Sequence, residues 1–80
     1  MDITLYGADR CHKTQHYIRF FQDRDLEFVF LDVEKHEKHA ADLRRLYTNG
    51  RLNFPTITLD HKKLRNPSDS ELLKWIDTLT

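Results

Sequence analysis

Apolar and polar residues follow two different periods along this chain, and the two periods predict short strands alternating with helices. Apolar runs rich in β-branched and aromatic residues predict strands at 3–6, 27–33 and 54–59, with Leu64 anchoring a fourth. Apolar residues three and four positions apart predict helices over 15–24, around 40–47 and around 72–79. The predicted order of elements is therefore βαβαββα.

This order predicts an α/β fold class in a single domain spanning residues 1–80. The first two strands are joined by a helix, so we expect them to be parallel with a right-handed crossover. The last two are joined by a tight turn at 60–63, so we expect them to be antiparallel. The run 27–33 is almost continuously apolar, which is typical of a strand buried on both faces. A mixed four-stranded sheet with three helices on its faces follows.

Two helix boundaries carry local signals. The Asn-Gly pair at 49–50 predicts the end of the second helix, because its glycine suits a left-handed cap. The last helix has two competing starts. Ser68 with Glu71 fits a capping box, and Asn66 with Pro67 at the first helical position fits a proline-initiated helix.

Composition narrows the class of protein. Thirteen basic and thirteen acidic residues give a formal net charge of zero, so no global charge favours nucleic acid or an anionic membrane. No apolar run is long enough to cross a bilayer, and the chain shows no signal-peptide pattern before its first strand. One cysteine excludes an internal disulfide and points to a reducing compartment. We expect a cytoplasmic monomer.

The one cysteine, Cys11, lies on the predicted turn between the first strand and the first helix. Unpaired backbone N–H groups and the positive end of the helix dipole favour an anion there, and the thiolate is the reactive form of cysteine. Arg10 and Lys13 are cationic, and His12 and His16 can become so. A lone cysteine is often an inert buried side chain. Its position among cations favours a reactive thiol instead.

Three neighbouring features leave alternatives open. Thr14 either fills a helical position or, one turn after Cys11, donates a hydrogen bond to the thiolate. His12 and His16 lie four apart near the cysteine, but no fourth ligand is nearby, so we expect no metal site. Pro55 by itself indicates only the start of an edge strand.

Taken with the predicted layout, two motifs carry a resemblance to a known family. Cys11-His12-Lys13-Thr14 stands where the glutaredoxins of the thioredoxin fold have Cys-x-x-Cys or Cys-x-x-Ser. Phe54-Pro55-Thr56 resembles their Val-Pro-Thr motif, which implies that this proline is cis and lies beside the cysteine. The resemblance covers nearly the whole chain. Asn66-Pro67-Ser68 before the last helix is most similar to the short mycoredoxin-type branch.

The resemblance implies thiol–disulfide exchange with a low-molecular-weight thiol such as glutathione or mycothiol. Thr14 replaces the second cysteine, so only a monothiol mechanism is available. The Gly-Gly pair that usually precedes the last helix is absent, and the motif is not the Cys-Gly-Phe-Ser of the iron–sulfur-carrying branch. The motif is also similar to the Cys-x-Lys-Ser of arsenate-reductase-like proteins, although Gln15 stands where those carry arginine.

The residues expected to form the site flank the cysteine, the proline and the start of the last helix. They are Cys11 and Thr14 as catalytic residues, and Arg10, His12, Lys13, Phe54, Pro55, Ser68 and Asp69 as substrate-binding residues. In this scheme Arg10 and Lys13 are either plain surface charges or cations that bind the carboxylates of a thiol tripeptide. The backbone at Phe54 pairs with the bound thiol, and the first N–H groups of the last helix receive a carboxylate.

Two functions follow as hypotheses. The first is a glutaredoxin-like oxidoreductase, without a bound cofactor or metal, that acts on mixed-disulfide proteins with a small thiol as co-substrate. The second is a binding or redox-sensing module that keeps the fold but turns over little. The missing second cysteine and the missing Gly-Gly pair favour the second hypothesis.

Overall fold

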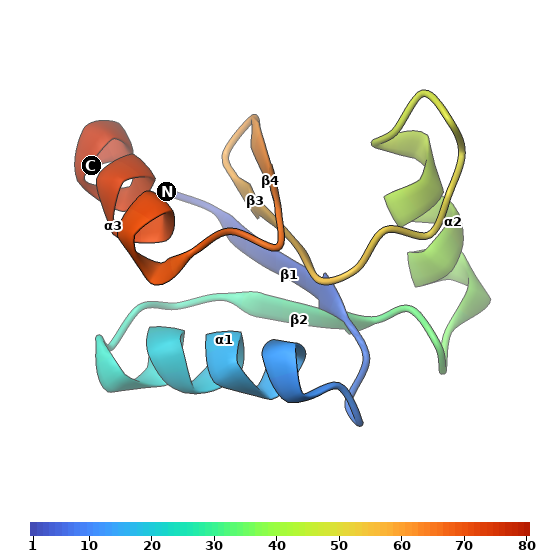
Figure 1. The fold of residues 1–80 in the computed structure, drawn as a ribbon, viewed down its shortest axis with the longest axis horizontal. Coiled ribbons are helices and arrows are strands. Elements are labelled where there is room, and N and C mark those ends of the chain that lie inside the picture. Colours follow the sequence, from blue (N-terminus) through green and yellow to red (C-terminus); the bar gives the residue numbers. More distant parts are fainter.

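The computed structural model describes residues 1–80, and its elements follow the predicted order (Figure 1). Four strands form one sheet, and three helices pack on it. The strands are β1 (Ile3–Gly7), β2 (Val29–Asp32), β3 (Thr56–Leu59) and β4 (Lys62–Arg65), and the helices are α1 (His12–Asp23), α2 (Glu37–Arg45) and α3 (Asp69–Leu79). None of the helices combines the length and the apolar character that a membrane span requires.

The sheet is mixed, with the strand order β2-β1-β3-β4. β1 pairs with β2 in parallel and with β3 antiparallel, and Leu5 lies opposite Phe30 on one side and Ile57 on the other. β3 and β4 are antiparallel neighbours joined by a tight turn. Both predicted pairings, and the predicted α/β class, are therefore confirmed.

The two faces of the sheet carry cores of different size. α1 and α3 cover one face and α2 covers the other (Figure 1). On the first face, Leu5, Phe21 and Ile57 are fully buried within a cluster of ten buried residues. On the second face, the buried cluster contains only Val33, Ala40 and Leu43. The central strands supply Ile3, Leu5, Ile57 and Leu59 to the first core, whereas the alternate residue Tyr6 of β1 packs against the second.

The prediction that strand 27–33 is buried on both faces was wrong. β2 spans only Val29–Asp32 and is an edge strand, paired with β1 alone. Val29 is 55% exposed. The run looked doubly buried because Phe28 and Phe30 pack against the α1–α3 core, while Val33 packs under α2.

Element boundaries also differ in part from the prediction. α2 ends at Arg45, so Gly50 does not cap it, although Gly50 does adopt the left-handed conformation with φ +64° in the following loop. The residues between the end of α2 and Gly50 form turn hydrogen bonds, such as the one from the Tyr47 N–H to the Arg44 carbonyl (3.2 Å). The start of α3 is settled in favour of Ser68, whose side chain accepts a hydrogen bond from the backbone N–H of Glu71.

Candidate functional site

Cys11 lies where the first strand delivers the chain into the first helix. It is the N-cap residue of α1, with extended backbone (φ −82°, ψ 124°), and its side chain is partly exposed. Its N–H donates to the Ala8 carbonyl at 2.9 Å, and its own carbonyl accepts the Gln15 N–H at 3.0 Å. The first N–H groups of α1 have no helical partner, so they are free to bind an anion at the sulfur.

Thr14 lies directly beneath this turn. It is fully buried, and its hydroxyl oxygen accepts the Ala8 N–H at 3.2 Å. Since that oxygen is used as an acceptor, its O–H remains free to donate to the sulfur of Cys11. Gly7 permits this arrangement, because a Cβ at position 7 would lie 2.4 Å from the Thr14 hydroxyl oxygen.

The environment of Cys11 favours the thiolate. Partial burial raises the pKa of the thiol, but hydrogen bonds from the backbone N–H and hydroxyl of Thr14 lower it. The Lys13 N–H and the positive charge of Arg10 lower it further, so the pKa lies below its ordinary value. A depressed pKa raises the thiolate fraction at neutral pH, which is the form that attacks disulfides.

Asp32 holds the cysteine loop, and the sequence reasoning missed it. Its buried carboxylate accepts the backbone N–H of Asp9 at 3.0 Å, of Glu34 at 2.9 Å and of Lys35 at 3.0 Å. Burial raises the pKa of Asp32, but these three bonds and the Lys35 charge outweigh it and leave the pKa below its usual range. An acidic residue ending an otherwise apolar run was the one available sequence signal.

Ion pairs connect the same two loops at the surface. The guanidinium of Arg10 donates through Nε (2.9 Å) and Nη2 (2.6 Å) to the two carboxylate oxygens of Glu34. Lys35 Nζ lies 3.2 Å from the carboxylate of Asp9. Two guanidinium nitrogens of Arg10 are thus hydrogen-bonded within the chain, whereas Lys13 is exposed and has no ion pair.

The Phe54-Pro55 peptide bond is cis, as the resemblance implied. Thr56 of β3 pairs with Tyr6 of β1, which places the proline at the end of the sheet that leads into the cysteine loop. The fully buried Thr56 hydroxyl donates to the Asn53 carbonyl at 2.6 Å, which fixes the chain just before the proline.

The start of α3 meets α1 near the cysteine. His16 Nε2 lies 2.8 Å from the carboxylate of Asp69, and Tyr17 donates its hydroxyl to the Pro67 carbonyl at 2.6 Å. Burial raises the pKa of Tyr17 to about 12, so it remains a donor at neutral pH. The Ser68 side chain is used as the α3 cap. The structure therefore brings the predicted α3 residues to α1, but it commits both side chains to contacts within the chain.

No group of three or more His, Cys, Asp or Glu side chains is arranged to hold a metal ion. His12 and His16 are both exposed on α1, and His16 is paired with Asp69.

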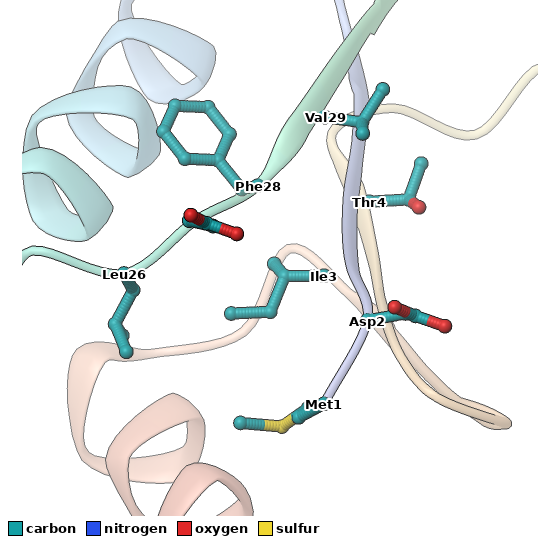
Figure 2. Close-up of a pocket in the computed structure, with 8 residues that line it drawn as sticks. Met1, Asp2, Ile3, Thr4, Leu26, Phe28 and Val29 are labelled. Carbon is teal, nitrogen blue, oxygen red and sulfur yellow. The ribbon is translucent and has the colours of Figure 1, made fainter.

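The larger of two pockets lies elsewhere. It has a volume of about 690 Å³ and opens between the start of β1 and the segment that leads into β2. Ile3, Leu26 and Phe28 point toward the helices there, and Val29 points to the other side of the sheet (Figure 2). This pocket lies at the opposite end of β1 from Cys11, so it does not contribute to the thiol site.

Comparisons with known proteins place the fold. No family model matches the sequence, and no curated protein matches it either. Among solved structures, a mutant of the thioredoxin-like protein BC3987 has a TM-score of 0.75 at 19% identity, covering 92% of this chain and 97% of that one. The glutaredoxin grx-1 from Archaeoglobus fulgidus has a TM-score of 0.77 at 16% identity, covering 92% and 84%.

Thioredoxin 1 from Thermosipho africanus TCF52B is also similar, with a TM-score of 0.68 at 20% identity over 98% of this chain and 92% of that one. All these matches extend over most of both chains, which agrees with the βαβαββα order and the mixed sheet. The protein therefore has the thioredoxin fold.

Proposed function

We propose that this protein is a monothiol, glutaredoxin-like thiol–disulfide oxidoreductase. The observation that carries the proposal is Cys11 at the N-cap of α1, partly exposed, with a pKa lowered by Thr14. Thiols of this kind are the reactive ones, and inert structural cysteines lack such surroundings. The thioredoxin fold, with Cys11 at the start of its first helix, supports the same activity.

The reaction needs only one cysteine. The Cys11 thiolate attacks the small-thiol sulfur of a mixed disulfide, the S–S bond breaks, and the protein substrate leaves as a thiolate. A second small thiol, as its thiolate, then attacks the adduct on Cys11. That step frees the cysteine and produces the disulfide of the small thiol. Thr14 supports both steps, because its hydroxyl stabilises the Cys11 thiolate as attacking and as leaving group.

The small thiol, glutathione or mycothiol, would lie between the cysteine and the loop before β3. Backbone groups at Phe54, next to the cis Pro55, offer a strand-like edge for a short peptide or amide. The first N–H groups of α3, at Ser68 and Asp69, suit a carboxylate. Lys13 supports this binding as an exposed cation with no partner, while Arg10 would contribute its free Nη1.

The alternative function is a redox-sensing module that takes the adduct but turns over little. Glu34 favours it, because that carboxylate already occupies two nitrogens of Arg10. A substrate carboxylate would have to compete with it.

One experiment separates the two. The protein is incubated with glutathione disulfide or mycothiol disulfide, and its intact mass is measured. Turnover of a glutathionylated peptide is followed in parallel, with Cys11→Ser as the control. An adduct with turnover supports the oxidoreductase, and an adduct without turnover supports the sensor. A wild-type mass that stays unchanged, like that of the control, would overturn both.

A further inference from the structure

A second, smaller pocket lies beside Cys11 on the solvent side of α1. It has a volume of about 280 Å³ and is lined by four polar residues with no apolar or acidic side chain among them: Arg10, His12, Gln15 and Arg19. The three helical positions are three and four residues apart, so they share one face. The core-facing residues Thr14, Tyr17 and Phe21 lie on another face of the helix.

The charges of this pocket are only partly used within the chain. Arg19 makes no ion pair, whereas Arg10 is paired with Glu34 through Nε and Nη2. The side-chain amide nitrogen of Gln15 donates to the Asp9 carbonyl at 2.8 Å, which fixes the position of this lining side chain. The first turn of α1 contains no acidic residue. Arg19 therefore supplies an unpaired positive charge to the pocket, while the Arg10 charge is paired with Glu34 and the Asp9 carboxylate accepts from the Gln15 amide at 3.2 Å.

The pocket lies next to Cys11, although Cys11 itself does not line it. Arg10 and His12 are the chain neighbours of Cys11, and Arg19 follows seven residues after His12. Seven helical residues rise about 10 Å, and an extended peptide covers that length with about three residues. A peptide whose sulfur bonds to Cys11, or lies one S–S bond beyond the sulfur that Cys11 attacks, can thus place its third neighbouring residue at Arg19.

We propose that this pocket binds an acidic side chain of the protein substrate, about three residues from the substrate cysteine. Guanidinium groups match the planar geometry of a carboxylate and donate charge-assisted hydrogen bonds to it. The pocket then selects protein substrates by the charge beside their disulfide. This proposal rests on the proposed function, because it assigns the pocket to substrates that Cys11 attacks.

The test uses three peptides that differ at one position. Each carries one cysteine as a mixed disulfide with uncharged 2-thiopyridine, and the third residue from that cysteine is Glu, Gln or Lys. Attack by Cys11 on the peptide sulfur breaks the disulfide, and the leaving pyridinethiolate takes up a proton to form the thione. Its absorbance gives the rate. We expect the Glu peptide to react roughly tenfold faster than the Lys peptide at low salt, and this ratio to shrink as salt screens the charges.

Charge-changing variants test whether the Glu-to-Lys rate ratio depends on this pocket. Arg19→Glu should lower the Glu-to-Lys rate ratio to about one or below, and Arg19→Lys should retain most of it. Lys74→Glu is the matched control, since it makes the same change of net charge at an exposed position on α3, outside the pocket. It should leave the ratio unchanged.

Two outcomes would overturn the inference. Equal rates for the three peptides with wild-type protein would show that the pocket does not distinguish the charge of the substrate. That outcome would leave the proposed function of Cys11 unaffected. An equal loss of the ratio in Arg19→Glu and Lys74→Glu would show a general field instead of a site. Failure of all three peptides to react would instead mark the failure of the proposed function.

Discussion

At the scale of single residues, Thr14 contacts both the loop before α1 and the thiol of Cys11. Its hydroxyl accepts the Ala8 N–H and hydrogen-bonds to Cys11, while its side chain packs against Gly7. Thr14 therefore fills a buried helical position, and its hydrogen bond to Cys11 lowers the pKa of that thiol.

Thr14→Val tests the second role. Valine keeps the shape but removes the hydroxyl, so the pKa of Cys11 should rise and the thiolate fraction at mildly acidic pH should fall. A hydrogen bond to a charged group is worth on the order of 1.5 kcal/mol, so alkylation by iodoacetamide at pH 6 should slow roughly tenfold. The measurement is the alkylation rate across pH.

Thr14→Ser is the control for this prediction, since it retains the hydroxyl and should retain most of the wild-type rate below neutral pH. Superimposable pH profiles for wild type and Thr14→Val would show that the hydroxyl does not stabilise the thiolate.

At the scale of elements, loops and helix ends position the site more than the strands do. The carboxylate of Asp32, at the end of β2, joins the loop before α1 to the loop before α2. At the other side, Ser68 begins α3, and Asp69 and Tyr17 connect that start to α1. Cys11 is thus held by contacts between element ends.

Asp32→Asn should destabilise the protein by about 1–3 kcal/mol at pH 7, because an amide cannot accept all three backbone bonds as a carboxylate does. The pKa of Asp32 is depressed, so its contribution is present above the unfolded value of about 3.9 and is lost as the pH falls through the folded value. The difference between variant and wild type in urea unfolding should therefore narrow below about pH 4.

Asp23→Asn is the matched control for the Asp32 prediction, because Asp23 is exposed and makes no side-chain hydrogen bond. It should change stability little at either pH. A difference for Asp32→Asn that persists unchanged into acid would contradict the assignment of its effect to the ionised carboxylate.

The cap of α3 offers a second test at this scale. Ser68→Ala removes the acceptor of the Glu71 N–H (3.1 Å) and should cost about 1 kcal/mol, or roughly 4–8 °C in Tm for a domain of this size. Ser70→Ala lies inside the helix, where alanine is the better helix former, and should be neutral or slightly stabilising. Equal Tm values for the two variants would show that α3 does not depend on this cap.

At the scale of the whole molecule, the two cores differ in size. The α1–α3 face contains ten buried apolar residues, and the α2 face contains three. β1 and β3 are the inner strands of the sheet, so they are paired on both edges. Regions with few buried apolar contacts open locally at lower free energy than the global unfolding.

We therefore expect native-state hydrogen exchange to separate the two faces. Amides of β1 and β3 should exchange only through global unfolding, with protection that falls steeply as urea is added. Amides of α2 should exchange faster, through a smaller opening with a weak dependence on urea. Protection in α2 equal to that in β1 would show that the domain opens only as one unit.

Much of the fold was predictable because its signals are local. The periods of the apolar positions specify the element order, and the crossover rule then specifies the parallel and antiparallel pairs. The position of Cys11 at a helix start and the cap at Ser68 also follow from neighbouring residues. The cis Pro55 followed from the resemblance and not from the proline itself.

The tertiary structure alone decided the features that depend on distant partners. Val29 is exposed because β2 has a neighbour on one side only, which an apolar run does not reveal. Asp32 and Glu34 reach the cysteine loop from more than twenty positions away, and nothing in local periodicity specifies such pairs. The sequence by itself determined that Cys11 lies at a helix start beside Arg10 and Lys13, because these signals are local. Chain folding determined what holds and surrounds that residue, because hydrogen bonds and ion pairs form between segments that only the packed sheet brings together.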